Sequence, residues 1–338
     1  MTRARQRITV VGAGISGLWA ARTLALRGHR VRLVEASAEP FAQSASRYAG
    51  AMLAPDCEAE AAEPIVRDLG FAALGLWRAA FPGAAFRGSL VLAQPRDRGE
   101  LLRFARMTQG HEAVDGERLA ALEPDLAGRY ASALYYPQEG HMAPAAAMAA
   151  LLGQARAAGC EVRLGETWRP VADASCDGVI DCRGLAACAD LPALRGVRGE
   201  RVVLRARDVS LSRPVRLLHP RFPLYIVPWG DGLYMVGATV IETEDAGPVT
   251  ARSALELLGA AYAVHPAFGE AEIVELGAGV RPAFADNVPR LVPKLVADGR
   301  RLHINGLYRH GFLLSPILAE LAAGWVETGD ASHPIFAT

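Results

Sequence analysis

The order of apolar and polar residues predicts an α/β layer at the start of the chain. Residues 8–11 form a short apolar run that stops at a glycine, residues 18–27 have helical spacing, and residues 31–34 form a second short strand. Similar patterns return further along the chain. We expect a helix at 144–158 and strands at 160–164, 178–181 and 302–305 to complete this first sheet.

A second kind of pattern fills the middle of the chain. Residues 201–241 are dense in short strands, and the turn at 229–232 is a strong hairpin signal. Short strands alternating with polar residues are typical of an antiparallel sheet with one covered face. Strands are expected at 89–94, 133–136, 202–205, 224–227, 233–240 and 272–277, and helices at 64–80, 99–108, 117–123 and 251–262. A final amphipathic helix should begin at residues 312–315, because Pro316 is tolerated only in a first turn.

Three glycines after the first strand have the spacing of a dinucleotide-binding turn. Gly12 permits the tight turn, Gly14 lets the backbone approach a pyrophosphate, and Gly17 lets helix and strand pack closely. The amino end of the following helix would hold the phosphate charge. Glu35 ends the second strand, where an acid can accept hydrogen bonds from ribose hydroxyls. This motif predicts nucleotide binding and leaves NAD and FAD equally open.

Composition narrows the class of protein. The chain has 338 residues, and its 36 basic residues balance its 36 acidic ones, which argues against a nucleic-acid-binding protein. No apolar run approaches the roughly 18 residues of a membrane span. The five cysteines show neither a CxxC motif nor a metal-ligand spacing. We therefore expect small buried cysteines in a reducing cytoplasm, and no metal.

No nucleophile elbow or carboxylate pair stands out, so a bound cofactor is expected to supply the chemistry. Arg281 stands between an apolar strand and Pro282, where it would either clamp a carboxylate or form a structural ion pair. Arg309 precedes the last helix, whose N–H groups could face an electron-rich ring or be capped in the ordinary way. Tyr225 and Tyr234 offer a hydroxyl or fill the core. The two late histidines, His303 and His310, are poor candidates for a general base.

Several motifs in order resemble the FAD-dependent D-amino acid oxidase superfamily, and most closely its bacterial glycine oxidases, which include the thiamine-biosynthesis oxidase. The resemblance covers nearly the whole chain. The motifs are GAGISG with Glu35, AGAMLAP, YIVP with GAT ten residues on, GVRP followed by DNVP, and YRHGFLLSP. The implied fold is α/β, or α+β overall, with a Rossmann-like FAD-binding domain (1–84, 141–200 and 276–338) interleaved with a substrate-binding domain on an antiparallel β-sheet (85–140 and 201–275).

The resemblance also implies residue roles. Arg281, Arg309, Tyr225 and Met52 would bind the substrate. The FAD contacts would be Gly12, Gly14, Ile15, Ser16, Gly17, Glu35, Ala36, Ala45, Ser46, Gly50, Ala51, Met52, Leu307, Tyr308, Arg309, His310, Gly311, Phe312 and Leu313. The superfamily's sarcosine oxidases tether FAD through a late cysteine. Since none follows Cys188 here, we expect noncovalent FAD.

The implied reaction is the oxidation of a small amino acid, with glycine expected first. The substrate would pass a hydride to the flavin without a protein base, and dioxygen would become hydrogen peroxide. The imine would give an oxo acid and ammonia, with a role in thiamine biosynthesis. A homo-oligomer is expected. Two alternatives remain: a dehydrogenase of a D-amino acid or secondary, sarcosine-like amine that uses another acceptor, and a non-catalytic flavin-binding subunit.

Three features depart from the glycine oxidase pattern. Val240 follows GAT where those enzymes tend to carry methionine, which puts the size of the substrate pocket in doubt. Arg47 and Tyr48 are bulky for a flavin loop. Residues 165–177 are short, so the adenine contact is expected, without firm placement, at residues 168–171.

Overall fold

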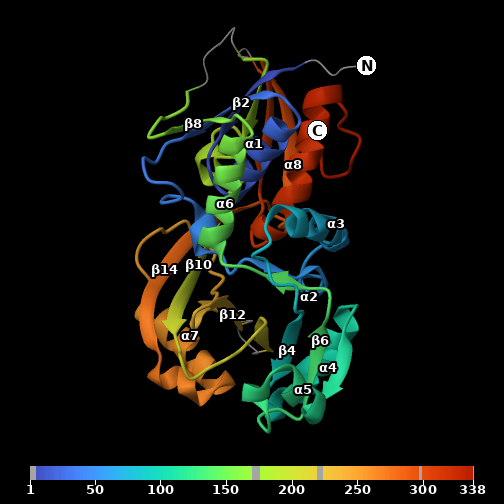
Figure 1. Ribbon diagram of the computed structural model, residues 1–338, viewed down its shortest axis with the longest axis vertical. Helices are drawn as coiled ribbons and strands as arrows, with labels where there is room; N and C mark the ends of the chain where they lie inside the picture. Colours follow the sequence, from blue (N-terminus) through green and yellow to red (C-terminus); the bar gives the residue numbers. More distant parts are fainter. Residues whose placement is uncertain (1–4, 170–175, 219–223, 297–298, 338) are drawn as a thin grey trace.

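The computed structural model describes residues 5–169, 176–218, 224–296 and 299–337. Its two large sheets lie in two parts of an elongated molecule, one above the other in Figure 1. This mixed α/β architecture confirms the predicted fold class.

The first sheet has six strands in the order β15-β16-β9-β1-β2-β8. All neighbouring pairs are parallel except β15 and β16, which form an antiparallel hairpin. Helix α1 packs against α6 and α8, and α8 also packs against α3 (Figure 1). The strands are β1 (Arg7–Val11), β2 (Arg30–Glu35), β8 (Glu161–Leu164), β9 (Gly178–Asp181), β15 (Arg290–Val296) and β16 (Gly299–Asn305); the helices are α1 (Ile15–Leu26), α3 (Pro64–Ala80), α6 (Pro144–Ala157) and α8 (Gly311–Thr328).

Helix α8 begins earlier than its proline predicts. It starts at Gly311, which leaves Pro316 in the second turn rather than the first. Proline has no N–H, so the carbonyl of Phe312 loses its helical donor. The indole Nε1 of Trp77, on α3, donates to that carbonyl at 2.6 Å instead. A long-range hydrogen bond thus compensates for a local defect that the sequence pattern treats as a boundary.

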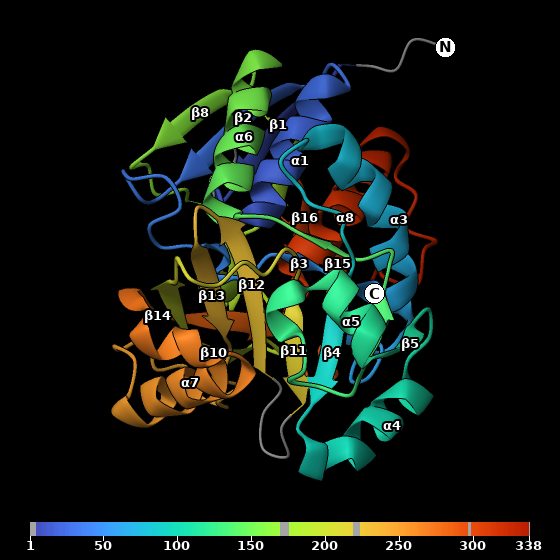
Figure 2. The ribbon, with the colours of Figure 1, turned by 60° about the horizontal axis from the view of Figure 1, so that its bottom comes forward.

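The second sheet has eight strands in the order β14-β10-β13-β12-β11-β4-β6-β5. Its pairs are antiparallel, as predicted, except that β4 and β11 run parallel. Helix α7 packs on β10, β12 and β13, while α4 and α5 pack near β4 and β6 (Figure 2). The strands are β4 (Ser89–Ala93), β5 (Glu112–Asp115), β6 (Ser132–Tyr136), β10 (Arg195–Arg205), β11 (Val215–Leu218), β12 (Leu224–Gly230), β13 (Leu233–Gly237) and β14 (Glu272–Ala283); the helices are α4 (Arg98–Met107), α5 (Gly116–Leu122) and α7 (Ala251–Val264).

Strand β14 is longer than expected, and this corrects the position of Arg281. The predicted end at Gly277 is wrong, because β14 stays paired with β10 as far as Ala283. The ring of Tyr48 packs on Gly277 and Gly279: a Cβ at either would lie 2.7–2.8 Å from it. These glycines make room for a side chain from the flavin loop and do not end the strand. Arg281 therefore lies within β14 rather than after it.

A small antiparallel sheet pairs β3 (Met52–Leu53) with β7 (Gly140–His141), and helix α2 (Pro55–Glu58) follows β3 along the chain. The domain division given above stays a proposal, and strands β10 and β14 both cross its boundaries at residues 200 and 276. Among the described residues, no helix combines the length and apolarity that crossing a bilayer requires.

Candidate functional site

A cavity of about 680 Å³ opens between the two large sheets. The glycine turn, the loop before β3, strand β14 and the segment that leads into α8 all line it. Every residue named as an FAD or substrate contact lines this cavity except Gly17, and of the described part of the expected adenine segment Trp168 lines it whereas Arg169 does not. The fold thus brings together segments from the start, middle and end of the chain, although the individual roles of these residues stay predictions.

The glycine turn has the geometry that its spacing predicts. Gly12 has φ +92°, and a Cβ there would lie 2.8 Å from the carbonyl oxygen of Cys182. At Gly17 a Cβ would overlap the carbonyl oxygen of Gly12, so any larger residue would push α1 away from β1. The turn is therefore as tight as nucleotide-binding turns need, and Gly17 serves packing rather than the cavity wall.

Glu35 is fixed at the end of β2 beside this turn. Its carboxylate accepts hydrogen bonds from the backbone N–H of Ala13 at 2.6 Å and of Ser37 at 3.0 Å. No side chain caps the amino end of α1 from its N-cap position, although Ile15 N donates to Ser46 Oγ at 3.1 Å. A close backbone turn, a helix amino end and an acid at the second strand fit the phosphates and ribose of FAD.

The predicted flavin loop approaches the second sheet closely. Ala51 has φ +55°, a conformation that non-glycine residues seldom adopt and that often occurs at ligand sites. Gly50 faces Tyr225 on β12, and a Cβ there would lie 3.0 Å from the tyrosine ring. Met52 pairs with His141 in the small sheet. The loop is thus held between sheets with little room for larger side chains.

The segment that leads into α8 and the first residues of that helix form another part of the cavity wall. Leu307 to Leu313 all line the cavity, and Tyr308 has φ +48°. Tyr308 N donates to the carbonyl of Pro282 at 2.8 Å, which ties this turn to the end of β14. His310, the N-cap residue of α8, makes no side-chain hydrogen bond to the first turn, so this amino end can offer N–H groups and positive dipole to an electron-rich ring edge.

Arg281 reaches the cavity from β14. Its Nη1 donates to the backbone carbonyl of Thr239 at 3.2 Å. Among the residues that the structure describes, no carboxylate lies within ion-pair distance of it. Its guanidinium passes over Gly199 of β10, where a Cβ would overlap Nη2. Burial is the largest influence on this group and lowers the pKa of Arg281, although an arginine remains charged. A partly buried cation without a carboxylate partner favours binding of an anionic ligand.

Arg309, the second predicted substrate arginine, is held differently. Its Nη2 lies 3.6 Å from Glu58, whose carboxylate also takes Arg216 Nη2 at 2.9 Å and faces His310 Nδ1 at 3.5 Å. Burial alone would raise the pKa of Glu58, but the charges of Arg309 and Arg216 outweigh it and lower that pKa to about 2. Burial lowers the pKa of His310 to about 4, so its ring is neutral near pH 7.

Comparison with known proteins agrees with this geometry. Residues 7–325 match the family described as FAD dependent oxidoreductase, DAO. The chain belongs to this family. A Rhizobium etli protein that bears the name thiamine biosynthesis oxidoreductase ThiO is 54% identical to it, over 93% of this chain and 94% of that one. A glycine oxidase of Geobacillus kaustophilus is 28% identical, with 98% and 95% covered. The crystal structure of a Bacillus cereus glycine oxidase has the same fold, with a TM-score of 0.84 at 24% identity and coverage of 98% and 99%.

Membership of this family makes the protein an FAD-dependent oxidoreductase, which resolves the choice between NAD and FAD. Some candidates from the sequence lie elsewhere. The hydroxyl of Tyr234 donates to Val209 O at 2.5 Å in the core, and His303 lies outside the cavity lining. Val240 is 41% exposed and does not line the cavity. In the segment expected to contact adenine, Trp168 lines the cavity, whereas residues 170–171 lie outside the described residues.

Several cavity residues were not predicted from the sequence. Glu58, Glu166, Thr167, Arg183 and Asn305 all line it. Glu58 is one of four acids between residues 56 and 63, and apart from position nothing in the sequence distinguishes one of these carboxylates as functional. Its position just after the flavin loop was the one available sign.

Proposed function

We propose that this oxidoreductase oxidises the amine of a small amino acid, with glycine as the expected substrate. The observation that carries the proposal is Arg281, a cation in the cavity wall whose partner is a backbone carbonyl rather than a carboxylate. A substrate carboxylate would supply the missing charge through a charge-assisted, bidentate contact.

The chain's own residues would act by binding and orientation. Arg281 would hold the carboxylate, while Tyr225 and Met52 would border Cα. Bound FAD would supply the chemistry by accepting a hydride from Cα. Holding two reactants in register can be worth roughly 7–11 kcal/mol of the barrier, so positioning can supply much of the catalysis.

No side chain is assigned the role of base. His310 is held neutral by burial, but it faces Glu58 rather than an open part of the cavity. The amino acid would lose a hydride from Cα and a proton from nitrogen, two electrons and two protons in all, to become an imine, which water hydrolyses to an oxo acid and ammonia. Dioxygen would take the two electrons and two protons and leave as hydrogen peroxide.

The names of the relatives support a biological role. One relative is named for thiamine biosynthesis and another as a glycine oxidase. We therefore propose that the product serves thiamine biosynthesis. A cytoplasmic location, noncovalent FAD and a homo-oligomer remain predictions.

The test begins with the purified, yellow holoprotein kept anaerobic. Glycine should bleach the flavin, and readmitted air should restore the colour with one hydrogen peroxide for each glycine consumed. A panel of glycine, sarcosine, D-alanine and D-proline would rank the substrates. Bleaching without oxygen consumption would indicate a dehydrogenase with another acceptor. A flavin that no amino acid bleaches would refute the enzymatic proposal and favour a flavin-binding subunit.

A further inference from the structure

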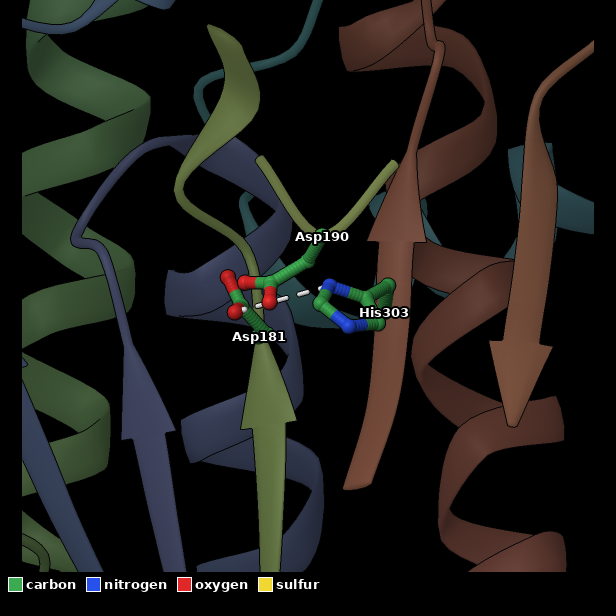
Figure 3. A group of neighbouring side chains, drawn as sticks. All are labelled: Asp181, Asp190 and His303. Atoms are coloured by element: carbon green, nitrogen blue, oxygen red, sulfur yellow. Dashed lines mark ion pairs between the residues drawn. The ribbon is translucent and has the colours of Figure 1, made fainter. Parts of the chain in front are cut away.

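A second cluster of buried ionisable groups lies at the carboxyl ends of strands in the first sheet. Asp181, at the end of β9, and His303, its neighbour in register on β16, are both 0% exposed. Asp190 follows the short 3-10 helix Gly184–Ala187 and approaches the same place. Figure 3 shows the three side chains directed toward one another, with His303 Nδ1 3.4 Å from Asp181 Oδ2.

The arrangement invites comparison with a metal site, because the candidate ligand atoms lie within 4.8 Å of one another. A cation already occupies the position between the carboxylates, however. Arg183 Nε lies 3.0 Å from both oxygens of Asp181, and its Nη2 lies 2.6 Å from Asp181 and from Asp190. Arg301 Nη1 adds a second positive charge 3.6 Å from Asp190. Two guanidinium groups leave little unbalanced negative charge for a metal ion.

Arg183 also faces the large cavity, at the end marked by Glu35 and Trp168. The backbone N–H of Glu166 donates to the carbonyl of Glu35 at 3.0 Å, which holds the segment that carries Trp168 beside the end of β2. The guanidinium carbon of Arg183 lies 5.2 Å from the centre of the Trp168 ring, and that of Arg301 lies 4.9 Å from it. Three flat groups, the indole of Trp168 and the guanidinium groups of Arg183 and Arg301, therefore meet where the adenosine half of FAD should lie.

We propose that Arg183 and Trp168 form the surface on which the adenine ring of FAD stacks. Asp181 and Asp190 hold the guanidinium of Arg183 in the orientation that this stacking requires. Arginine and tryptophan both stack on purine rings. The proposal depends on FAD binding and is independent of which amine is oxidised.

Charge balance explains why this end would take a base rather than a phosphate. Asp181 and Asp190 compensate the charge of Arg183, so a further anion gains little there. The phosphates have a better place at the glycine turn and the amino end of α1. A neutral aromatic ring needs only flat surfaces that are held still. The carboxylate of Asp181 is held by Arg183, whose Nε and Nη2 both donate to it.

The test compares two flavins bound to apoprotein. FAD carries the adenosine half and FMN does not, so the ratio of their affinities, followed by quenching of flavin fluorescence, reports the adenine contact alone. Arg183→Met and Trp168→Leu should each raise the Kd for FAD about tenfold or more and leave that for FMN unchanged. Arg252→Met, an exposed arginine on α7, serves as the matched control and should change neither.

Three results would overturn the proposal. The first is FAD affinity unchanged in both variants. The second is an equal loss for FAD and FMN, which would mean damage to the fold rather than a lost adenine contact; thermal unfolding of each apoprotein would check this. The third is a rise in Tm of the wild-type holoprotein with Zn²⁺ or Mg²⁺ that His303→Gln abolishes, which would make the cluster a cation site. A holoprotein that binds FAD normally but ignores glycine would refute the substrate proposal alone.

Discussion

Two arginines line the same cavity and are held in opposite ways. Arg183, at the Glu35 end, lies between the carboxylates of Asp181 and Asp190. Arg281, at the Tyr225 end, donates to a backbone carbonyl and has no carboxylate partner among the described residues. An arginine already matched by carboxylates gains little from another anion, whereas one matched by a neutral dipole gains much.

The difference assigns the two ends of the cavity to different ligand groups. The Arg281 end suits a carboxylate, and the Arg183 end suits an uncharged ring. The charge of Arg309 is only partly compensated, because Arg309 shares the single carboxylate of Glu58 with Arg216. The role of each arginine therefore depends on which charges surround it, and not only on its position in the cavity wall.

The largest effect is expected from removing the unmatched cation. Arg281→Met should lower kcat/KM for glycine by roughly a thousandfold, about 4 kcal/mol, because it deletes a charge-assisted contact in a partly buried site. FAD content should stay at the wild-type level, measured by absorbance of the purified protein. Arg252→Met, an exposed arginine on α7, is the control. Activity within tenfold of wild type would remove Arg281 from carboxylate binding.

The next prediction concerns the pH dependence of stability and tests His310, which faces the Glu58 carboxylate. The folded protein holds the pKa of His310 at about 4, below its ordinary value of 6.5. As pH falls from 6.5 to 4, the unfolded chain takes up a proton that the folded chain refuses, so stability is lost over this window, by up to about 3 kcal/mol. Glu58 and Arg309 face His310. The negative charge of Glu58 favours protonation of the His310 ring, whereas burial and the positive charge of Arg309 disfavour it.

Urea unfolding at pH 7 and pH 4.5 would measure this loss. The His310→Gln protein should lose less stability between the two pH values than the wild type does. His333→Gln, a histidine outside the cluster, should leave the wild-type difference intact. Equal acid sensitivity in all three proteins would show that His310 does not resist protonation.

The parts of the site that were predictable from sequence are local. The turn at Gly12 to Gly17 and the acid at Glu35 are specified by short stretches: a Cβ at Gly12 or Gly17 would meet backbone atoms, and Glu35 accepts the N–H of Ala13 in the same turn. The segment Leu307 to Leu313 has the same character, since it is a tight turn that leads directly into a helix. Local steric rules are readable without knowing what packs nearby.

The parts that were missed depend on partners far away in sequence. Glu58 gains its role from Arg216 and Arg309, which come from other elements. Asp181 and His303 meet because β9 and β16 are neighbours in a sheet whose strand order no local pattern encodes. In each case the sequence shows which residues are present, but it does not show that they lie close together in the fold.

A smaller effect is expected from crowding Arg281 instead of deleting it. A Cβ at Gly199 would overlap its Nη2, so Gly199→Ala should displace the guanidinium and raise KM for glycine about tenfold, with a stability cost of roughly 1–3 kcal/mol. Gly259→Ala is the control, and its effect on the free energy of unfolding should have the opposite sign. It lies in α7 with open space around it and should stabilise the protein by about 0.5–1 kcal/mol. An unchanged KM in Gly199→Ala would mean that the position of Arg281 is not critical.

The smallest effect separates the two carboxylates that hold Arg183. Asp190 has a side chain 32% exposed, whereas that of Asp181 is 0% exposed. Asp190→Asn should weaken FAD binding by no more than about threefold, since partly exposed pairs contribute roughly 0.2–1 kcal/mol, and added salt should shrink the difference. Asp181→Asn should weaken it much more, because Asp181 bonds Nε and Nη2 together. Equal losses from both variants would mean that the summed negative charge, rather than the orientation of Arg183, is what FAD binding requires.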